Sequence, residues 1–207
     1  MRWHTINSMN IIAFIILFTL IAEFILNLAA DWLNLKMVTA DLPAPFHGTC
    51  DKARYRKSQE YLRVNTRFEW ITSGFHLLIL LLFWFGKGFP LVDAWIRSFG
   101  RGPVVTGLLY IGFLVLLYAV LAQPFALYAT FVIEERFGFN KTTIKTYGMD
   151  LLKGMLLSII LGGPLLAGIL AFFEYVVEAA WLYCWLVIIL YMLVIQFIVP
   201  TWIMPLF

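Results

Sequence analysis

The sequence predicts an all-α, polytopic transmembrane protein with about five membrane-spanning helices. Of its 207 residues, 62% are hydrophobic and only 13% are charged, and the mean hydropathy is +0.88. A soluble domain is roughly 45–50% apolar and about 25% charged, so this chain has too few polar side chains to cover a water-facing surface. Lipid must cover the remainder, and the lipid bilayer is therefore the first expected partner.

Five windows along the chain meet or approach the length of a membrane span. A helix that crosses roughly 30 Å of hydrocarbon needs about 20 apolar residues. The first window has a longer apolar run than a signal-peptide core, and no A-x-A site follows it, so we expect a retained helix. The second is short but continues a helical pattern upstream, and Pro164 is expected to kink the fourth. Glycine and proline clusters punctuate the chain at 86–90 and 100–103. The predicted spans are residues 10–30, 68–85, 104–122, 154–173 and 178–199.

Lysine and arginine are unevenly distributed between the two sides of these spans. The segment after the first span contains seven of them and the segment between the third and fourth spans contains four, whereas the opposite side carries only Arg2, Lys87, Arg97 and Arg101. Because cytoplasmic loops hold the excess of basic residues, we expect the N-terminus outside and the C-terminus in the cytoplasm. The short outer loops favour a prokaryotic inner membrane, with the endoplasmic reticulum membrane as the eukaryotic alternative.

The formal net charge of +3 does not indicate nucleic-acid binding. The basic residues gather beside the ends of the spans rather than on one soluble face. Topology and contact with anionic lipid explain them sufficiently. We therefore expect no nucleic-acid partner.

Histidine placement argues against a metal site in this chain. A zinc protease carries H-E-x-x-H on a helix, with two imidazoles one turn apart and the glutamate as base. The three histidines are His4, His47 and His76, and no pair has that spacing. His47 and Cys50 lie three residues apart, but two candidate ligands do not make a zinc site. We expect neither a metal ligand nor a catalytic residue here.

Three of the polar side chains inside predicted spans are candidates for a functional role. Glu23 and Asn27 lie four residues apart in the first span and so share one helical face, and His76 lies in the second. A carboxylate within the hydrocarbon is costly, so Glu23 should face a cavity, a partner or a polar seam between helices. Cavity lining and structural helix pairing remain equal alternatives. For His76 we expect a hydrogen bond to a neighbouring helix.

The stretch after the third span carries a specific pattern. It reads QPFALYATFVIEERFGFNKTTIKTYGMDLLKG from Gln123 to Gly154, and it resembles the N-terminal membrane domain of the type I CAAX prenyl proteases, a family of polytopic zinc metalloproteases. Tyr55-x-x-Ser58-x-x-Tyr61 and the prolines Pro200 and Pro205 match as well. The matching core is Phe131, Glu134, Glu135, Phe137, Gly138, Phe139, Asn140, Thr143, Asp150 and Lys153.

Four residues of this pattern suggest local roles. Gly138 should let the chain turn. Phe137 and Phe139 are expected to anchor the segment against the membrane surface. Asn140 is expected to cap a following helix through its side-chain oxygen.

The resemblance implies that the membrane helices enclose a chamber, and that a catalytic domain with H-E-x-x-H and a later glutamate ligand follows the fifth helix on the cytoplasmic side. The sequence ends at Phe207, before such ligands. We therefore expect an anchor and chamber wall for a zinc metalloendopeptidase, without catalysis by this chain alone. Zinc, a missing or separately encoded catalytic domain, and a membrane-associated or prenylated peptide would belong to the whole enzyme.

Two other functions stay open. The domain could serve as a stand-alone scaffold or adaptor in the membrane. A transporter has less support, because Glu23 and His76 are the only ionisable residues well inside a predicted span.

Overall fold

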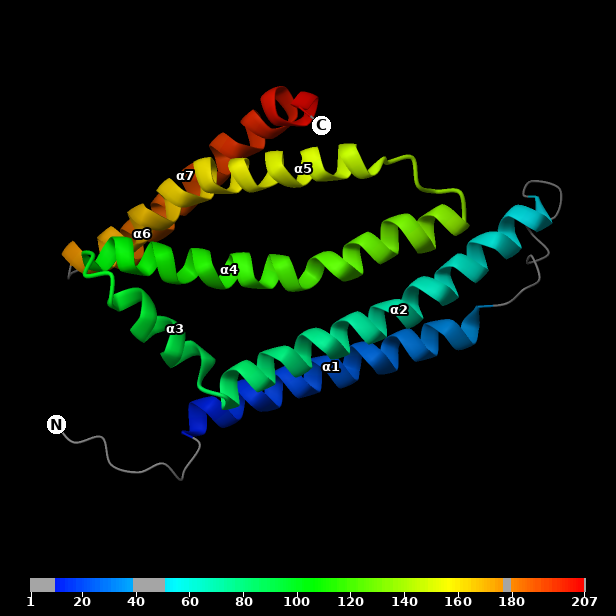
Figure 1. Cartoon of the computed structure of the whole chain (residues 1–207), viewed down its shortest axis with the longest axis horizontal. Coiled ribbons are helices and arrows are strands. Elements are labelled where there is room, and N and C mark those ends of the chain that lie inside the picture. The colour runs from blue at the N-terminus through cyan, green and yellow to red at the C-terminus, as the bar shows by residue number, and fades with distance from the viewer. Residues whose placement is uncertain (1–9, 39–50, 177–179, 207) are drawn as a thin grey trace. The chain divides into compact units, whose positions relative to one another are not determined.

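The computed structural model describes residues 10–38, 51–176 and 180–206, and all regular structure within these ranges is helical (Figure 1). His4, His47, Cys50 and Phe207 lie outside the described residues. The α-helices are α1 (Ile11–Met37), α2 (Lys52–Phe85), α3 (Gly88–Arg97), α4 (Pro103–Tyr128), α5 (Ile144–Leu157), α6 (Gly163–Tyr175) and α7 (Ala180–Ile198). π-helical turns cover Ala129–Glu134, Ser158–Gly162 and Val199–Ile203, and a 3-10 turn covers Met204–Leu206.

Five stretches of the described chain are long and apolar enough to cross a membrane. They are Ile11–Met37, Lys52–Phe85, Pro103–Glu134, Ile144–Tyr175 and Trp181–Ile203. The all-α fold class with five membrane helices is thus confirmed. The helices run past the apolar windows because a helix satisfies its own backbone hydrogen bonds and need not end where hydrocarbon ends. At 1.5 Å per residue, the 34 residues of α2 extend about 51 Å, well beyond the roughly 30 Å of a bilayer core.

Helix α3 is not among the elements predicted from the sequence. It begins at Gly88, inside the first glycine and proline cluster, and ends before the second. Pro90 falls in its first turn, where a missing backbone N–H costs no helical bond. Near its end, Arg97 donates to both carboxylate oxygens of Asp93 at 2.9 and 2.8 Å. That bond, together with the attraction of the carboxylate, raises the pKa of Arg97.

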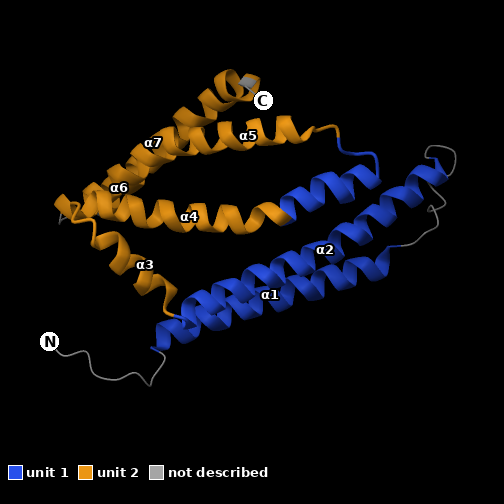
Figure 2. Ribbon diagram, in the orientation of Figure 1, with its two compact units in different colours: residues 1–86, 125–140 blue, residues 87–124, 141–207 orange. Residues whose placement is uncertain are grey.

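The chain divides into two compact units, and each contains more than one stretch of sequence (Figure 2). The first unit comprises residues 1–86 and 125–140, and the second comprises residues 87–124 and 141–207. One division falls inside α4 at Pro124, whose ring removes a backbone hydrogen bond from the helix.

In the first unit, α1 and α2 pack antiparallel. The indole Nε1 of Trp70 donates to Oδ2 of Asp31 at 3.1 Å, and Nη2 of Arg63 donates to the carbonyl of Val38 at 2.9 Å. The seven-residue step from Trp70 back to Arg63 matches the seven-residue step from Asp31 forward to Val38. The pair therefore keeps one register over two turns.

In the second unit, side chains join α3 to α4 and α6 to α7, and α4 approaches α6 closely. Trp95 of α3 meets Phe113 of α4 edge-on, with ring centroids 5.3 Å apart. Gly107 permits a close approach of α4 to α6, since a Cβ there would lie 2.9 Å from Cδ1 of Leu170. Phe172 of α6 stacks on Tyr183 of α7 at 6.1 Å. The fourth predicted span contains the π-helical turn Ser158–Gly162, which ends two residues before Pro164.

Candidate functional site

The E-E-R-F-G-F run forms a helix C-terminus of the Schellman type. Gly138 has φ +68° and occupies the left-handed region, which glycine enters at little cost. Its N–H donates to the carbonyl of Glu135 at 2.9 Å, and the N–H of Phe139 donates to the carbonyl of Glu134 at 2.9 Å. These two bonds are the pair that defines the motif. The prediction that Gly138 turns the chain is confirmed. The cap needs glycine at the left-handed position, and Phe137 and Phe139 are the residues on either side of it.

An aromatic seam holds this cap on α2. We use that name for Tyr61, Phe68 and Phe75 of α2 together with the rings of residues 125–139 that they contact. Phe75 lies 4.9 Å from Phe125, between ring centroids. Phe68 stacks on Tyr128 at 5.0 Å. Tyr61 meets Phe137 at 5.4 Å and Phe139 at 4.9 Å, both edge-on.

The seam has a simple origin in sequence. Its three members on α2 are spaced seven residues apart, so they fall on one face of a helix. The geometry is antiparallel, because going back along α2 from Phe75 to Tyr61 corresponds to going forward from residue 125 to residue 139. Each aromatic pair contributes about 0.5–1.5 kcal/mol beyond the area it buries. The seam therefore fixes the cap along α2.

Polar contacts surround the end of the seam near Tyr61 and Phe137. Nη2 of Arg136 lies 2.9 Å from Oε1 of Glu60, with the two side chains 63% and 58% exposed. Nδ2 of Asn140 donates to Oε2 of Glu135 at 3.1 Å. Exposed ion pairs contribute only about 0–1 kcal/mol, whereas Phe137 and Ile133 are each just 4% exposed. Apolar burial therefore contributes more to docking of the cap than charge does.

Two expected local roles are wrong. Phe137 has almost no free surface left for lipid, because its ring packs against Tyr61. Asn140 does not cap the next helix: Thr143 does, and its Oγ1 accepts from the N–H of Thr146 at 3.1 Å. The helix begins at Ile144, so Asn140 lies too far upstream to reach its first free N–H groups. Phe139 is half exposed, and its role as a membrane anchor stays a prediction.

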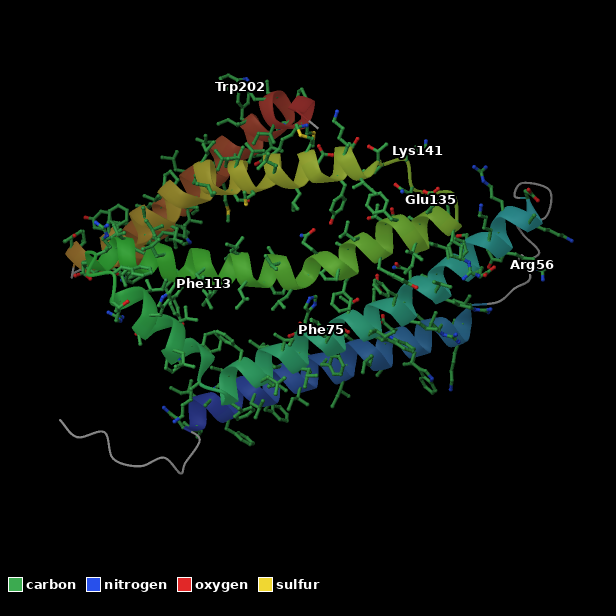
Figure 3. All side chains as sticks on the ribbon, in the orientation of Figure 1. Arg56, Phe75, Phe113, Glu135, Lys141 and Trp202 are labelled. Atoms are coloured by element: carbon green, nitrogen blue, oxygen red, sulfur yellow. The ribbon has the colours of Figure 1, made fainter. Side chains whose placement is uncertain are left out.

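The matching residues belong to both compact units. Those from Phe131 to Asn140 belong to the first unit, and Figure 3 labels Glu135 on this segment and Phe75 on α2. Thr143 and Asp150 lie on the second unit, at the start and in the middle of α5. Asp150 pairs with Lys153 of the same helix at 3.3 Å. Tyr147, also in α5, donates through its hydroxyl to Oε1 of Gln123 at 2.8 Å and so links α5 to α4.

A pocket of about 280 Å³ lies between α1 and α2. Asn27 lines this pocket, together with Asp31, Glu69 and Ser73. Glu69 accepts from Nδ2 of Asn65 at 2.6 Å. Glu23 lies one turn before Asn27 and is exposed, outside the pocket lining. Asn27 therefore lines a pocket, and Asp31, one turn farther along α1, pairs with Trp70 of α2.

His76 lies among aromatic rings, with Phe75 at 5.9 Å and Phe125 at 5.7 Å between ring centroids. Within the described part of the chain, no three His, Cys, Asp or Glu side chains are grouped so that they could hold a metal ion. These residues do not fit a zinc site, so no catalytic step through zinc can be derived from them.

Several residues of the site went unnoticed in the sequence. Phe68 and Phe75 were detectable from their seven-residue spacing to Tyr61. Asp31 was detectable because it continues the four-residue spacing of Glu23 and Asn27, but it lies one position beyond the predicted end of the first span. Glu69 carried no signal of its own, since its place opposite Asp31 depends on the register of α1 and α2.

Together, five apolar helices and a capped segment docked on α2 define a polytopic α-helical membrane domain. The family model for the CAAX prenyl protease N-terminal region, described as five membrane helices, matches residues 31–207. The chain belongs to this family, as its sequence pattern suggested.

Named relatives agree with this assignment. The probable CAAX prenyl protease 1 of Schizosaccharomyces pombe is 34% identical over 183 residues, which are 80% of this chain and 38% of that protein. The CAAX prenyl protease 1 homolog of Arabidopsis thaliana is 32% identical over 190 residues, covering 85% and 44%. The crystal structure of Ste24p from S. mikatae superposes with a TM-score of 0.83 at 26% identity, covering 91% of this chain and 46% of that one. The chain thus spans less than half the length of these relatives.

Proposed function

We propose that this chain is the membrane-embedded N-terminal part of a CAAX prenyl protease-like zinc metalloendopeptidase. In this proposal it anchors the enzyme and forms part of the wall of its intramembrane chamber. The catalytic metallopeptidase region, with its zinc, comes from sequence beyond the part matched here or from a separate chain. The observation that carries the proposal is the capped segment on α2, because the residues that build it are those that the family resemblance had singled out.

The substrate class follows from the same proposal. A membrane-associated peptide, prenylated at its end, would reach a chamber whose wall is built from apolar helices. This chain would hold the enzyme in the bilayer where such a peptide resides. The capped segment would support the chamber wall, and its residues are Glu134, Glu135, Phe137, Gly138, Phe139 and Asn140. Thr143 and Asp150 would shape the first half of α5.

Reconstitution tests this function. The full chain would be combined in liposomes with a metallopeptidase region carrying H-E-x-x-H, taken from beyond the matched part of the S. pombe relative. We expect cleavage of a farnesylated peptide that requires both parts and stops when a chelator removes zinc. A folded, zinc-loaded combination without cleavage would contradict the proposal and favour a membrane scaffold.

We also propose that the N-terminus faces outward and the C-terminus the cytoplasm, in a prokaryotic inner membrane or, in a eukaryote, the endoplasmic reticulum. The distribution of lysine and arginine supports this orientation. Single cysteines at the exposed positions Arg54 and Arg101, in a chain without its native cysteines, would test it. In sealed vesicles with the outer side exposed, an impermeant maleimide should label Arg101→Cys at once and Arg54→Cys only after permeabilisation. The reverse pattern would invert the topology.

A further inference from the structure

Three cationic side chains from two helices lie at one height in the α1–α2 pair. The contacts Asp31–Trp70 and Val38–Arg63 fix the antiparallel register. By interpolation, Lys36 of α1 lies level with position 65 of α2, between Arg63 and Arg67. All three cationic side chains are exposed.

This height coincides with the edge of the hydrocarbon. Counting about 20 residues back from Phe85, where α2 ends, reaches position 66. Trp32 and Trp70 lie near the same level, and tryptophan is enriched at membrane interfaces. Nζ of Lys36 lies 3.4 Å from the ring centroid of Trp32, an arrangement in which the lysine stem covers apolar surface and its charge stays in the polar layer.

Carboxylates nearby do not neutralise the three cations. In the described residues, the ion pairs are Arg97–Asp93, Arg136–Glu60 and Lys153–Asp150. Asp31 accepts from the indole of Trp70, and Glu69 accepts from Asn65. Arg63 gives one N–H to a backbone carbonyl and keeps further donors. The layer therefore presents several cationic donors where lipid phosphates lie.

We propose that Lys36, Arg63 and Arg67 bind the phosphate of an anionic phospholipid at this end of the α1–α2 pair. Arginine binds phosphate through paired N–H donors, and lysine contributes as a point charge. The bound lipid would bridge the ends of the two helices. This assignment goes beyond the proposed protease function and does not depend on it, because it concerns only how the first unit meets the membrane surface.

Two further cations on α2 decide between a lipid and a more distant acidic partner. Lys52 and Arg56 lie on the same helical face as Arg63 and Arg67, and Figure 3 labels Arg56 toward the N-terminal end of α2. Arg56 is seven residues beyond Arg63, or about 10 Å farther along the helix. That exceeds the Debye length of about 8 Å at physiological salt. A lipid site should need Arg63 and Arg67, which lie nearer the hydrocarbon and are called the inner pair. It should not need Lys52 and Arg56, which lie farther from it and are called the outer pair.

The experiment titrates the full chain, in phosphatidylcholine nanodiscs, with dioleoyl phosphatidylglycerol and measures bound lipid by native mass spectrometry. Replacing both inner arginines, as Arg63→Gln with Arg67→Gln, should weaken phosphatidylglycerol binding about 25-fold, as expected for two juxtamembrane charges. Arg63→Lys with Arg67→Lys should lose less affinity than the glutamine pair, because the charges remain while the paired N–H donors are lost. The matched outer pair, Lys52→Gln with Arg56→Gln, should leave it unchanged.

Three results would overturn the assignment. One is an equal loss with the outer pair, which would indicate a partner beyond the headgroup layer. Another is equal retention of phosphatidylcholine and phosphatidylglycerol by the unaltered chain. The third is displacement of phosphatidylglycerol by inorganic phosphate alone, which would indicate a soluble anion rather than a lipid.

Discussion

Replacing Phe137 by alanine is expected to undock the capped segment from α2. The side chain is 4% exposed and meets Tyr61 edge-on at 5.4 Å. Truncating a buried phenylalanine costs about 3–5 kcal/mol, from lost transfer free energy and the cavity left behind. Hydrogen exchange of the backbone amides of residues 133–140 would measure this opening. Their protection should fall by about two to four orders of magnitude or reach the unprotected rate.

A control separates aromatic packing from charge. Glu60→Gln removes the exposed ion pair with Arg136 and leaves the rings in place. We expect a cost of about 0–1 kcal/mol, as for other surface pairs. If Glu60→Gln loosened the segment as much as Phe137→Ala, the ion pair rather than the aromatic seam would hold the cap.

Replacing Gly138 by alanine is expected to strain the cap itself. Its φ of +68° is unfavourable for a residue with a Cβ by roughly 1–2 kcal/mol. A Cβ there would lie 3.7 Å from Nζ of Lys57, an ordinary contact, so the backbone and not crowding causes the loss. Chemical unfolding in detergent would measure the loss of stability. Gly138→Asn should cost less, since asparagine adopts the left-handed region more readily.

Gly148 gives a control of opposite sign for that substitution. It lies inside α5, and a Cβ there would meet nothing within 4 Å. Gly148→Ala should therefore stabilise the helix by about 0.5–1 kcal/mol. Equal destabilisation by Gly138→Ala and Gly148→Ala would mean that the left-handed turn is not what Gly138 provides.

The membrane fold could be predicted from sequence because hydrophobic length is a local property. Each apolar window of about 20 residues identifies a span by itself. Helix α3 was missed because it begins inside a glycine and proline cluster, which predicts a boundary rather than a helix, and its ten residues are too few for a span. The upstream extension of the second span was expected from its helical pattern, but its start at Lys52 was not, because the charged first half of α2 is helical without being apolar.

The candidate site shows a different limit. The family pattern identified Gly138 and its neighbours, and a turn could be assigned to the glycine. The hydrogen-bond partner of Asn140 could not be assigned. Its side chain is able to cap the following helix or to bond back to Glu135, and the sequence does not distinguish the two. The burial of Phe137 depends on Tyr61, which lies 76 residues earlier in sequence, and such a pairing is visible only when the helices are packed.

We propose that this chain supports a protease without supplying its reacting groups. The most direct measurement is kcat/KM for zinc-dependent cleavage by the reconstituted enzyme carrying Glu134→Gln with Glu135→Gln. Glutamine can still accept from Asn140, and the backbone carbonyl of Glu134 is unchanged, so the cap should persist. We predict cleavage within about tenfold of the unaltered enzyme, with any loss following stability. A loss of about 10²–10⁴-fold in a fully stable enzyme, the range of general acid–base catalysis, would contradict the claim.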